Sequence, residues 1–231
     1  MSTMIRRRLL SSSLAAALTF AALVSPGSLR LARAAEVAKE WDGLELRSSK
    51  RVDRLYVRPG ATLEGYKHVR LERLEVHFAK NWDPNRGRSG AERLTGEDFA
   101  RIKEALADAF AAECTKELAK GGYDVVTASG EDVLDVTPVV VDLFIAAPTV
   151  PVAGRTTSYT ADPGRMALIA ELRDSETGQS IARVIDRRNL PSTGNFQITT
   201  SVSNLGSARQ VIARWASALR AALDAANGKG N

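Results

Sequence analysis

The chain has 231 residues, 44% of them hydrophobic, which is enough for one well-packed core. Its single cysteine excludes an internal disulfide. The formal net charge of +5 arises from 32 basic and 27 acidic residues, an excess typical of proteins that bind nucleic acid or anionic lipid. However, five arginines and no acidic residue lie within the first 34 positions, so residues 35–231 carry 27 charges of each sign. We therefore predict no nucleic-acid partner.

The first 34 residues have the three parts of a signal peptide. Arg6-Arg7-Arg8 precedes an apolar run over residues 14–24, which Pro26-Gly27 ends, and the small-x-small sequence Ala32-Arg33-Ala34 follows. A membrane anchor is the alternative, but a spanning helix needs about 20 apolar residues, roughly twice the length of this run. We therefore predict that residues 1–34 are cleaved and that the mature chain, starting at Ala35, works in the periplasm.

Two further details concern export and anchoring. The stretch Arg6-Arg7-Arg8-Leu9-Leu10 loosely matches a twin-arginine signal, but an ordinary Sec leader is equally basic, and we favour Sec. A lipoprotein requires a cysteine at the cleavage point, whereas the only cysteine is Cys114. We therefore expect a mature form with neither a transmembrane anchor nor a lipid anchor.

Five segments carry strand patterns, and in chain order they are residues 69–78, 123–127, 132–146, 166–173 and 179–187. In the first segment the alternation slips near Glu72 and Arg73, which predicts a bulge or bend there. Pro138 cannot donate to a ladder, so we expect its strand at a sheet edge or bulged at that point. Residues 174–178 predict a hairpin between the last two strands, with Gly178 at positive φ.

Two helices are predicted. Thr95, with Asp98 three residues later, begins the first, and Gly121-Gly122 ends it. A second capping box over residues 207–210 begins the other. Cys114 falls on the apolar stripe of the first helix, which predicts a buried, inert thiol; a reactive nucleophile is the alternative. The two apolar stripes are Phe99, Ile102, Leu106, Phe110, Cys114 and Leu118, and Ile212, Trp215, Leu219 and Leu223.

This order predicts an α+β fold: a two-layer sandwich in which two helices cover one face of a mixed, mostly antiparallel sheet of about five strands. We expect a single domain over residues 35–226 and a disordered tail over residues 227–231. With a right-handed first crossover followed by hairpins, residues 147–165 and 188–206 leave the same end of the sheet, and residues 81–94 leave the opposite end. Connections of this length are functional or mobile.

The two connections that share an end carry a candidate site for a ligand or partner. Arg155, Tyr159, Asn195 and Phe196 combine a hydrogen-bonding fork, aromatic rings and an amide, the chemistry that interfaces favour. The alternative is structural, with Arg155 paired to a nearby acid and the rings covering a core edge. Trp82, in the third connection, is a further candidate contact, although a lid over the sheet end is the interpretation we favour.

No catalytic or metal-binding constellation is indicated, and no cofactor is predicted. His68 and His77 fall out of phase with the apolar residues of their strand and are expected to face solvent. The chain has no zinc-ligand spacing, phosphate-binding loop or nucleophile elbow. Asp142, surrounded by apolar residues, is interpreted as a partly buried structural residue; one carboxylate of a glycosidase-type pair is the alternative.

Short motifs in a fixed order run through nearly the whole mature chain. They are Trp41-Asp42-Gly43-Leu44, Tyr56-Val57-Arg58-Pro59-Gly60, Ala153-Gly154-Arg155, residues 171–178, Asp186-Arg187-Arg188 and Arg214-Trp215. In order and spacing they resemble the uncharacterised Gram-negative envelope proteins of domain-of-unknown-function family 3313 (DUF3313). The resemblance implies an exported protein, commonly a lipoprotein, without established activity or catalytic residues. Because this chain lacks the lipoprotein cysteine, a soluble periplasmic form is favoured.

The leading functional hypothesis is a non-enzymatic binding or adaptor module of the cell envelope, with an envelope protein or polymer as partner. Balanced charge and long converging connections support it. The alternative is a periplasmic hydrolase that acts on an envelope polymer through paired carboxylates, which would lie about 5 to 9.5 Å apart. A structural subunit of an oligomer is a third possibility.

Overall fold

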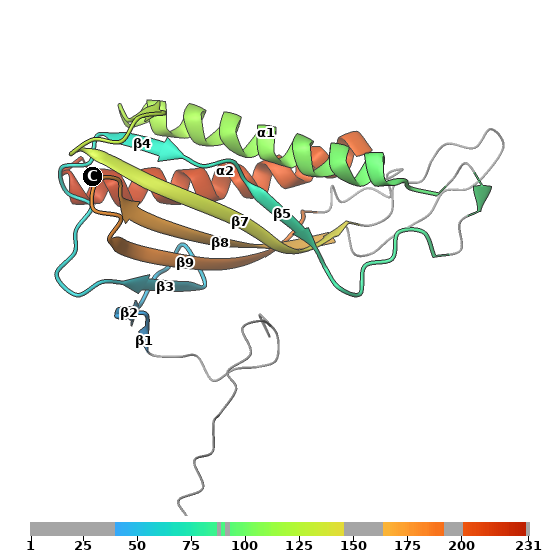
Figure 1. The fold of residues 1–231 in the computed structure, drawn as a ribbon, viewed down its shortest axis with the longest axis horizontal. Coiled ribbons are helices and arrows are strands. Elements are labelled where there is room, and N and C mark those ends of the chain that lie inside the picture. The colour runs from blue at the N-terminus through green and yellow to red at the C-terminus, as the bar shows by residue number, and fades with distance from the viewer. Residues whose placement is uncertain (1–39, 87–88, 91–92, 146–163, 192–200, 230–231) are drawn as a thin grey trace, which may run out of the picture. The chain divides into compact units, whose positions relative to one another are not determined.

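The computed structural model describes residues 40–86, 89–90, 93–145, 164–191 and 201–229. In this part of the chain nine strands form one sheet, and two long helices lie on one of its faces (Figure 1). The elements are β1 (Glu40–Trp41), β2 (Leu44–Arg47), β3 (Arg54–Val57), β4 (His68–Leu71), β5 (Glu75–Phe78), α1 (Gly96–Lys120), β6 (Asp124–Val126), β7 (Val133–Ile145), β8 (Gly164–Asp174), β9 (Ser180–Asn189) and α2 (Ser201–Ala226).

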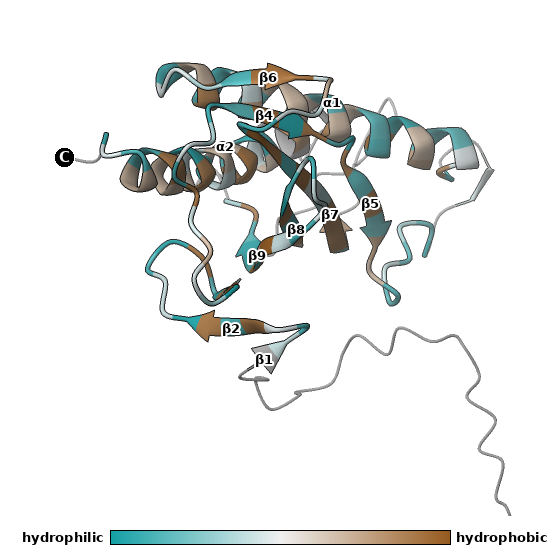
Figure 2. Ribbon diagram, turned by 60° about the vertical axis from the view of Figure 1, so that its left-hand side comes forward, coloured by the Kyte–Doolittle hydropathy of each residue, from teal (hydrophilic) through white to brown (hydrophobic). Residues whose placement is uncertain are grey.

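The predicted two-layer α+β class is confirmed, but the sheet has more strands than predicted. Its order is β1-β2-β3-β9-β8-β7-β4-β6, and β5 pairs with β7. Strands β1 to β3 form an antiparallel meander that extends the sheet from β9. Each has only two to four residues, too short for alternation to be recognised in the sequence. The apolar strands β7 and β8 lie beneath the helices (Figure 2).

The strand predicted over residues 69–78 is interrupted where the phase slip indicated. Glu72 and Arg73 separate β4 from β5, and both strands pair in parallel with β7. The Glu72 amide still donates to the Val136 carbonyl at 3.0 Å, so the chain follows β7 across the break. The two strands therefore lie along β7 as one strand with an interruption.

Pro138 lies opposite this gap. The pairing of β4 with β7 ends at Val136, and the pairing of β5 begins at Val139, so the ring without an N–H interrupts no parallel ladder. The prediction that this strand lies at an edge or bulges at Pro138 is wrong. β7 is an interior strand, and its register shift falls between Val141 and Phe144.

Strand direction also differs from the prediction. β6 and β7 both run parallel to β4, one on each side, because residues 127–132 lead the chain back to the start of β4 instead of forming a hairpin. Since β5 is parallel to β7, both strands point to the same end of the sheet, and the Ala79 amide donates to the Leu143 carbonyl at 2.9 Å. Residues 81–94 therefore leave the end from which β7 exits, and the predicted opposite end is wrong.

The first helix has the predicted ends. The Asp98 carboxylate accepts from the Thr95 amide at 2.7 Å, and this bond is the main reason why the pKa of Asp98 falls to about 2. At the other end, a Cβ on Gly121 would approach the Tyr123 ring to 2.6 Å, and Gly122 has a φ of +73°. Both glycines are therefore required by the local geometry.

The second helix begins at Ser201, not at Ser207 as predicted. The Ser207 hydroxyl donates to the Pro191 carbonyl at 3.0 Å, so it ties the helix to the segment after β9 instead of capping it. The predicted stripe is confirmed, since Ile212, Trp215 and Leu223 are buried and Leu219 is half-buried.

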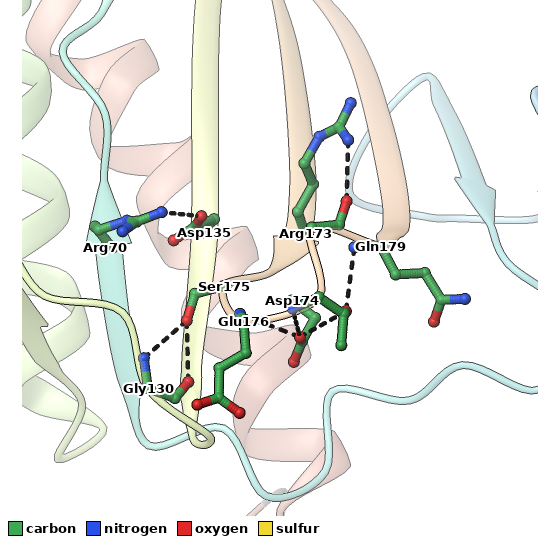
Figure 3. A network of polar contacts seen from close by, with 10 residues as sticks. Arg70, Gly130, Asp135, Arg173, Asp174, Ser175, Glu176 and Gln179 are labelled. Carbon is green, nitrogen blue, oxygen red and sulfur yellow. Dashed lines mark hydrogen bonds and ion pairs between the residues drawn. The ribbon is translucent and has the colours of Figure 1, made fainter.

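The predicted hairpin between β8 and β9 is confirmed. The Asp174 carboxylate accepts from the Thr177 amide at 2.8 Å and from its hydroxyl at 2.7 Å, and Gly178 has a φ of +68°. The Ser175 hydroxyl donates to the Gly130 carbonyl at 2.9 Å and accepts from its amide at 3.0 Å, which fixes the hairpin to the connection between β6 and β7 (Figure 3).

Residues 227–229 are held in place, although their composition predicted disorder. The Asn227 side chain accepts from the Gly65 amide at 3.0 Å and donates to the Leu223 carbonyl at 2.9 Å. The Lys229 ammonium donates to the Gly121 carbonyl at 2.8 Å. These bonds join the end of α2 to the segment before β4 and to the end of α1. Residues 230–231 lie outside the described residues.

Candidate functional site

An apolar cavity of about 270 Å³ lies between the second half of α2 and strands β3, β8 and β9. Its inner wall consists of buried side chains from both layers of the fold. They include Phe110, Leu168, Leu172, Ile181, Trp215 and Ala216. The cavity is therefore a break in the packing of the core beside β3.

The sequence of α2 explains why this space is left open. Ala218, Ala222 and Ala226 line the cavity and recur at intervals of four, which places them on one face of the helix. Large residues in the first half of the same helix, Val211 and Ile212, are almost fully buried. An alanine side chain ends at Cβ, so this face of α2 leaves space above the sheet, although Leu223 on the same half of the helix is buried in the core.

Cys114 lies in the inner wall and is 2% exposed. Burial raises the pKa of its thiol to about 12, with a smaller contribution from the nearby Glu113 carboxylate. The sulfur is therefore protonated at neutral pH, and the prediction of a buried thiol is confirmed. A thiol in this state contributes apolar surface and is not a nucleophile.

The mouth of the cavity carries polar groups next to half-buried apolar ones. Ser49 and Arg51 form it where the chain approaches β3, and Thr62 and Leu63 line the cavity beyond the other end of this strand. The Ser49 hydroxyl accepts from the amides of Arg51 and Val52 at 3.2 and 3.3 Å, which fixes the turn before β3. Arg51 is exposed, and its side chain has no hydrogen bond or ion pair with any residue that the structure describes.

Asp186 anchors the cavity wall next to Trp215. Its carboxylate is 0% exposed and accepts from Trp215 Nε1 at 2.6 Å, from Arg188 Nε and Nη2 at 2.6 and 2.9 Å, and from the Asp53 amide at 3.0 Å. A buried charge persists only when it is paired and hydrogen-bonded, and here each oxygen has two donors. The network joins α2, β9 and the segment before β3.

The size of the cavity has an energetic meaning. At about 24 cal/mol per Å³, an enclosed empty space of this volume would cost about 6 kcal/mol. The total stability of a domain is only about 5 to 15 kcal/mol. The space opens to solvent beside exposed lining residues such as Arg51 and Ala222, so its actual cost is smaller. This open apolar cavity is our candidate binding site.

The profile of the family described as "Protein of unknown function (DUF3313)" matches residues 33–219. The chain belongs to the DUF3313 family. No curated protein matches it.

Several solved structures resemble this DUF3313 protein. A PelC dodecamer subunit from Paraburkholderia phytofirmans is 12% identical with a TM-score of 0.37, covering 71% of this chain and 96% of that one. Protein XCC0632 from Xanthomonas campestris, assigned to DUF330, is 10% identical with a TM-score of 0.32, covering 71% and 86%. A putative neuraminyllactose-binding hemagglutinin homolog from Helicobacter pylori is 8% identical with a TM-score of 0.28, covering 69% and 83%. At these scores none supports an argument about function.

Two of the motifs that resemble DUF3313 meet at the buried carboxylate. Asp186-Arg187-Arg188 supplies the carboxylate and one donor, and Arg214-Trp215 supplies the indole. A third motif begins at Trp41, whose ring contacts Tyr56 edge-on at 5.7 Å and lies under the Arg183 guanidinium at 4.3 Å. These DUF3313 motifs are therefore accounted for by packing within the fold.

Four of the five predicted site residues lie outside the described residues, and the partner site that they form stays a prediction. The described ends of their two connections do lie side by side. Arg165 pairs with Asn189, and the Leu190 amide donates to the Gly164 carbonyl at 2.8 Å. The four residues are Arg155, Tyr159, Asn195 and Phe196.

Trp82 is the fifth predicted residue, and the structure places it over the end of the sheet. Its indole donates to the Ile145 carbonyl at 2.8 Å and stacks on Phe78 with ring centres 4.4 Å apart. Phe99 contacts the same ring edge-on at 5.7 Å. Trp82 therefore covers the end of the sheet. It is not among the residues that line the apolar cavity.

Asp142 is exposed, and the prediction of a partly buried aspartate is wrong. It lies in the register shift of β7 with a φ of +53°, a conformation that aspartate tolerates better than most residues.

His68 contacts Asp132 at 3.1 Å and His77 contacts Glu75 at 2.7 Å, both at the surface or partly exposed. Among the described residues, no group of three or more His, Cys, Asp or Glu is arranged to hold a metal ion.

The sequence interpretation missed the cavity. Its signal was the series of alanines at intervals of four in the second half of α2, combined with apolar strands that need cover.

Within the described part of the chain, no helix has the length and hydropathy needed to cross a bilayer.

Proposed function

We propose that this DUF3313 protein is exported to the periplasm and acts as a binding module that holds an apolar group in the cavity beneath α2. The cavity carries the proposal, because its walls are apolar and it opens to solvent beside exposed residues such as Arg51 and Thr62. The leader-like first 34 residues support export. The proposed target is a lipid-like or hydrophobic component of the cell envelope.

The chemistry of the cavity wall supports binding without catalysis. Its side chains are predominantly aliphatic or aromatic, and Cys114 is held as a thiol. The nearest buried carboxylate, Asp186, has all four of its acceptor positions occupied by donors. Groups of this kind exclude water and provide dispersion contacts, and a general acid or base needs a free position near the substrate.

A neutral fluorescent probe tests whether the cavity binds apolar groups. N-phenyl-1-naphthylamine should bind with increased emission, and Ala218→Phe, which fills the cavity from α2, should reduce its affinity at least about tenfold. Ala225→Phe is the matched control, because Ala225 is exposed on the same helix and does not line the cavity. Equal binding by wild type and Ala218→Phe, with both folded by circular dichroism, would exclude the cavity as the site.

Export is tested separately. Expression of the full chain in a Gram-negative host should yield a periplasmic protein whose first residue is Ala35. An uncleaved cytoplasmic protein would overturn this part of the proposal and leave the binding result unaffected.

A further inference from the structure

We infer that the cavity selects an amphiphile with a single negative charge, a single-chain fatty carboxylate whose head pairs with Arg51 while its chain enters the cavity. This inference rests on the proposed function and adds the chemical class of the ligand. It comes from three properties of the site: its length, the charge at its mouth and the shape of the guanidinium there.

The cavity is elongated along α2. Its lining runs on this helix from Trp215 to Ala226, which at about 1.5 Å per residue corresponds to about 16 Å. On the sheet side it extends from the turn before β3 to Leu63, just beyond that strand. A space of this form, with apolar walls, suits an unbranched hydrocarbon chain better than a compact ring system. Each buried CH₂ group would contribute favourably to binding.

The mouth presents a positive charge that the described residues leave unmatched. Arg51 lines the cavity and is exposed, and Lys50 precedes it in the chain. The exposed carboxylates of Asp53 and Glu64 are nearby, but neither forms an ion pair with Arg51 among the described residues. Asp53 accepts from the Arg187 amide at 2.9 Å, and Asp186 is paired with Arg188. An anionic head at the mouth therefore gains an attraction that a cationic head lacks.

The head group that fits best is a carboxylate. A guanidinium presents two parallel N–H donors that match the two oxygens of a carboxylate. The Ser49 hydroxyl accepts from two backbone amides, and its own proton remains available to a second anion oxygen.

The test compares three amphiphiles that have the same chain and different heads: dodecanoate, dodecanol and dodecyltrimethylammonium. Each displaces N-phenyl-1-naphthylamine from the delipidated full mature protein, below the concentration at which it forms micelles. We expect dodecanoate to bind about fivefold more tightly than dodecanol, the range of an exposed ion pair, and dodecyltrimethylammonium to bind most weakly. The preference for dodecanoate should shrink as salt screens the pair.

Variants at the mouth assign this preference to Arg51. Arg51→Gln should bring dodecanoate and dodecanol to within about twofold of each other, and Arg51→Lys should retain part of the difference. Arg47→Gln is the matched control, because Arg47 is an exposed arginine that pairs with Glu45 and does not line the cavity. It should leave all three affinities unchanged.

The possible results separate the inference from the proposed function. Equal binding of all three amphiphiles, blocked by Ala218→Phe, would overturn the fatty-carboxylate inference and leave an apolar binding site. A preference that persists in Arg51→Gln would also overturn it. If no amphiphile displaces the probe and the probe itself does not bind, the proposed function fails as well, and the cavity must be covered by protein.

Discussion

The two long helices cover the same face of one sheet, but they meet it in different ways. Under α1, large side chains such as Leu106 and Leu118 fill the space down to the strands. Under the second half of α2, Leu223 reaches the core, but Ala218, Ala222 and Ala226 line a space of about 270 Å³ that remains open. Both regions are apolar, so hydropathy does not distinguish them. The difference lies in side-chain volume, which separates a filled contact from an open space.

This contrast implies different sensitivity to mutation. A close-packed region loses free energy whenever a side chain shrinks, because a new void forms. A region that already contains a void loses mainly the contacts of the removed atoms. The Asp186 network contacts both regions, because its member Trp215 is buried in the core and also lines the cavity.

The largest expected effect is at this network. Asp186→Asn removes the charge that neutralises Arg188, and breaking a buried pair typically lowers the free energy of unfolding by about 3 to 5 kcal/mol. Urea denaturation measures the change. Asp142→Asn is the control: it makes the same chemical substitution at an exposed position with positive φ, where the change should stay within about 0.5 kcal/mol. Similar losses in both variants would show that burial of Asp186 does not matter.

A matched pair of leucines tests the comparison directly. Leu118 is 0% exposed under α1 and does not line the cavity, so Leu118→Ala should cost about 3 kcal/mol. Leu219 lines the cavity on α2 and is half-buried, so Leu219→Ala should cost about 1 kcal/mol or less. Equal costs in urea denaturation would mean that the two regions are packed alike.

Much of the fold could be predicted from local patterns. The capping box at Thr95, the glycines that end α1 and the Asp174 hairpin depend on residues close together in the chain. Strand direction depends on long-range pairing. The connection over residues 127–132 has hairpin composition, yet it returns the chain to the start of β4, and the error moved residues 81–94 to the wrong end of the sheet.

The candidate site could be predicted less well. A cavity depends on how much volume two distant elements leave between them, and periodicity reports only which residues face inward. The same limit explains Asp142. Apolar neighbours predicted burial, but a register shift in β7 turns this residue to solvent. The motifs that resemble DUF3313 were recognised as patterns, whereas the contact between Asp186 and Trp215 that explains two of them required coordinates.

The smallest effect concerns pH and the rim of the cavity. Donation by the Thr177 amide is the main reason why the pKa of Asp174 falls from 3.8 to about 2, and the Tyr66 hydroxyl contributes. Because the folded-state pKa is lowered, this carboxylate stabilises the fold above about pH 4, and its contribution disappears as the pH falls to about 2. Tyr66 follows Leu63, which lines the cavity, so protonation of Asp174 should loosen this side of the cavity in acid.

Asp174→Asn should therefore flatten the dependence of unfolding free energy on pH between 4 and 2, because the neutral amide loses the carboxylate's contribution at pH 7 and changes little near pH 2. Asp98→Asn is the matched control, since the pKa of Asp98 is also about 2 but its bonds lie at the start of α1. Both variants should flatten the curve, whereas only Asp174→Asn should reduce the acid-induced gain in hydrogen exchange at residues 61–66. If acid increases exchange at residues 61–66 equally in the wild type and in Asp174→Asn, protonation of Asp174 does not control the stability of this segment.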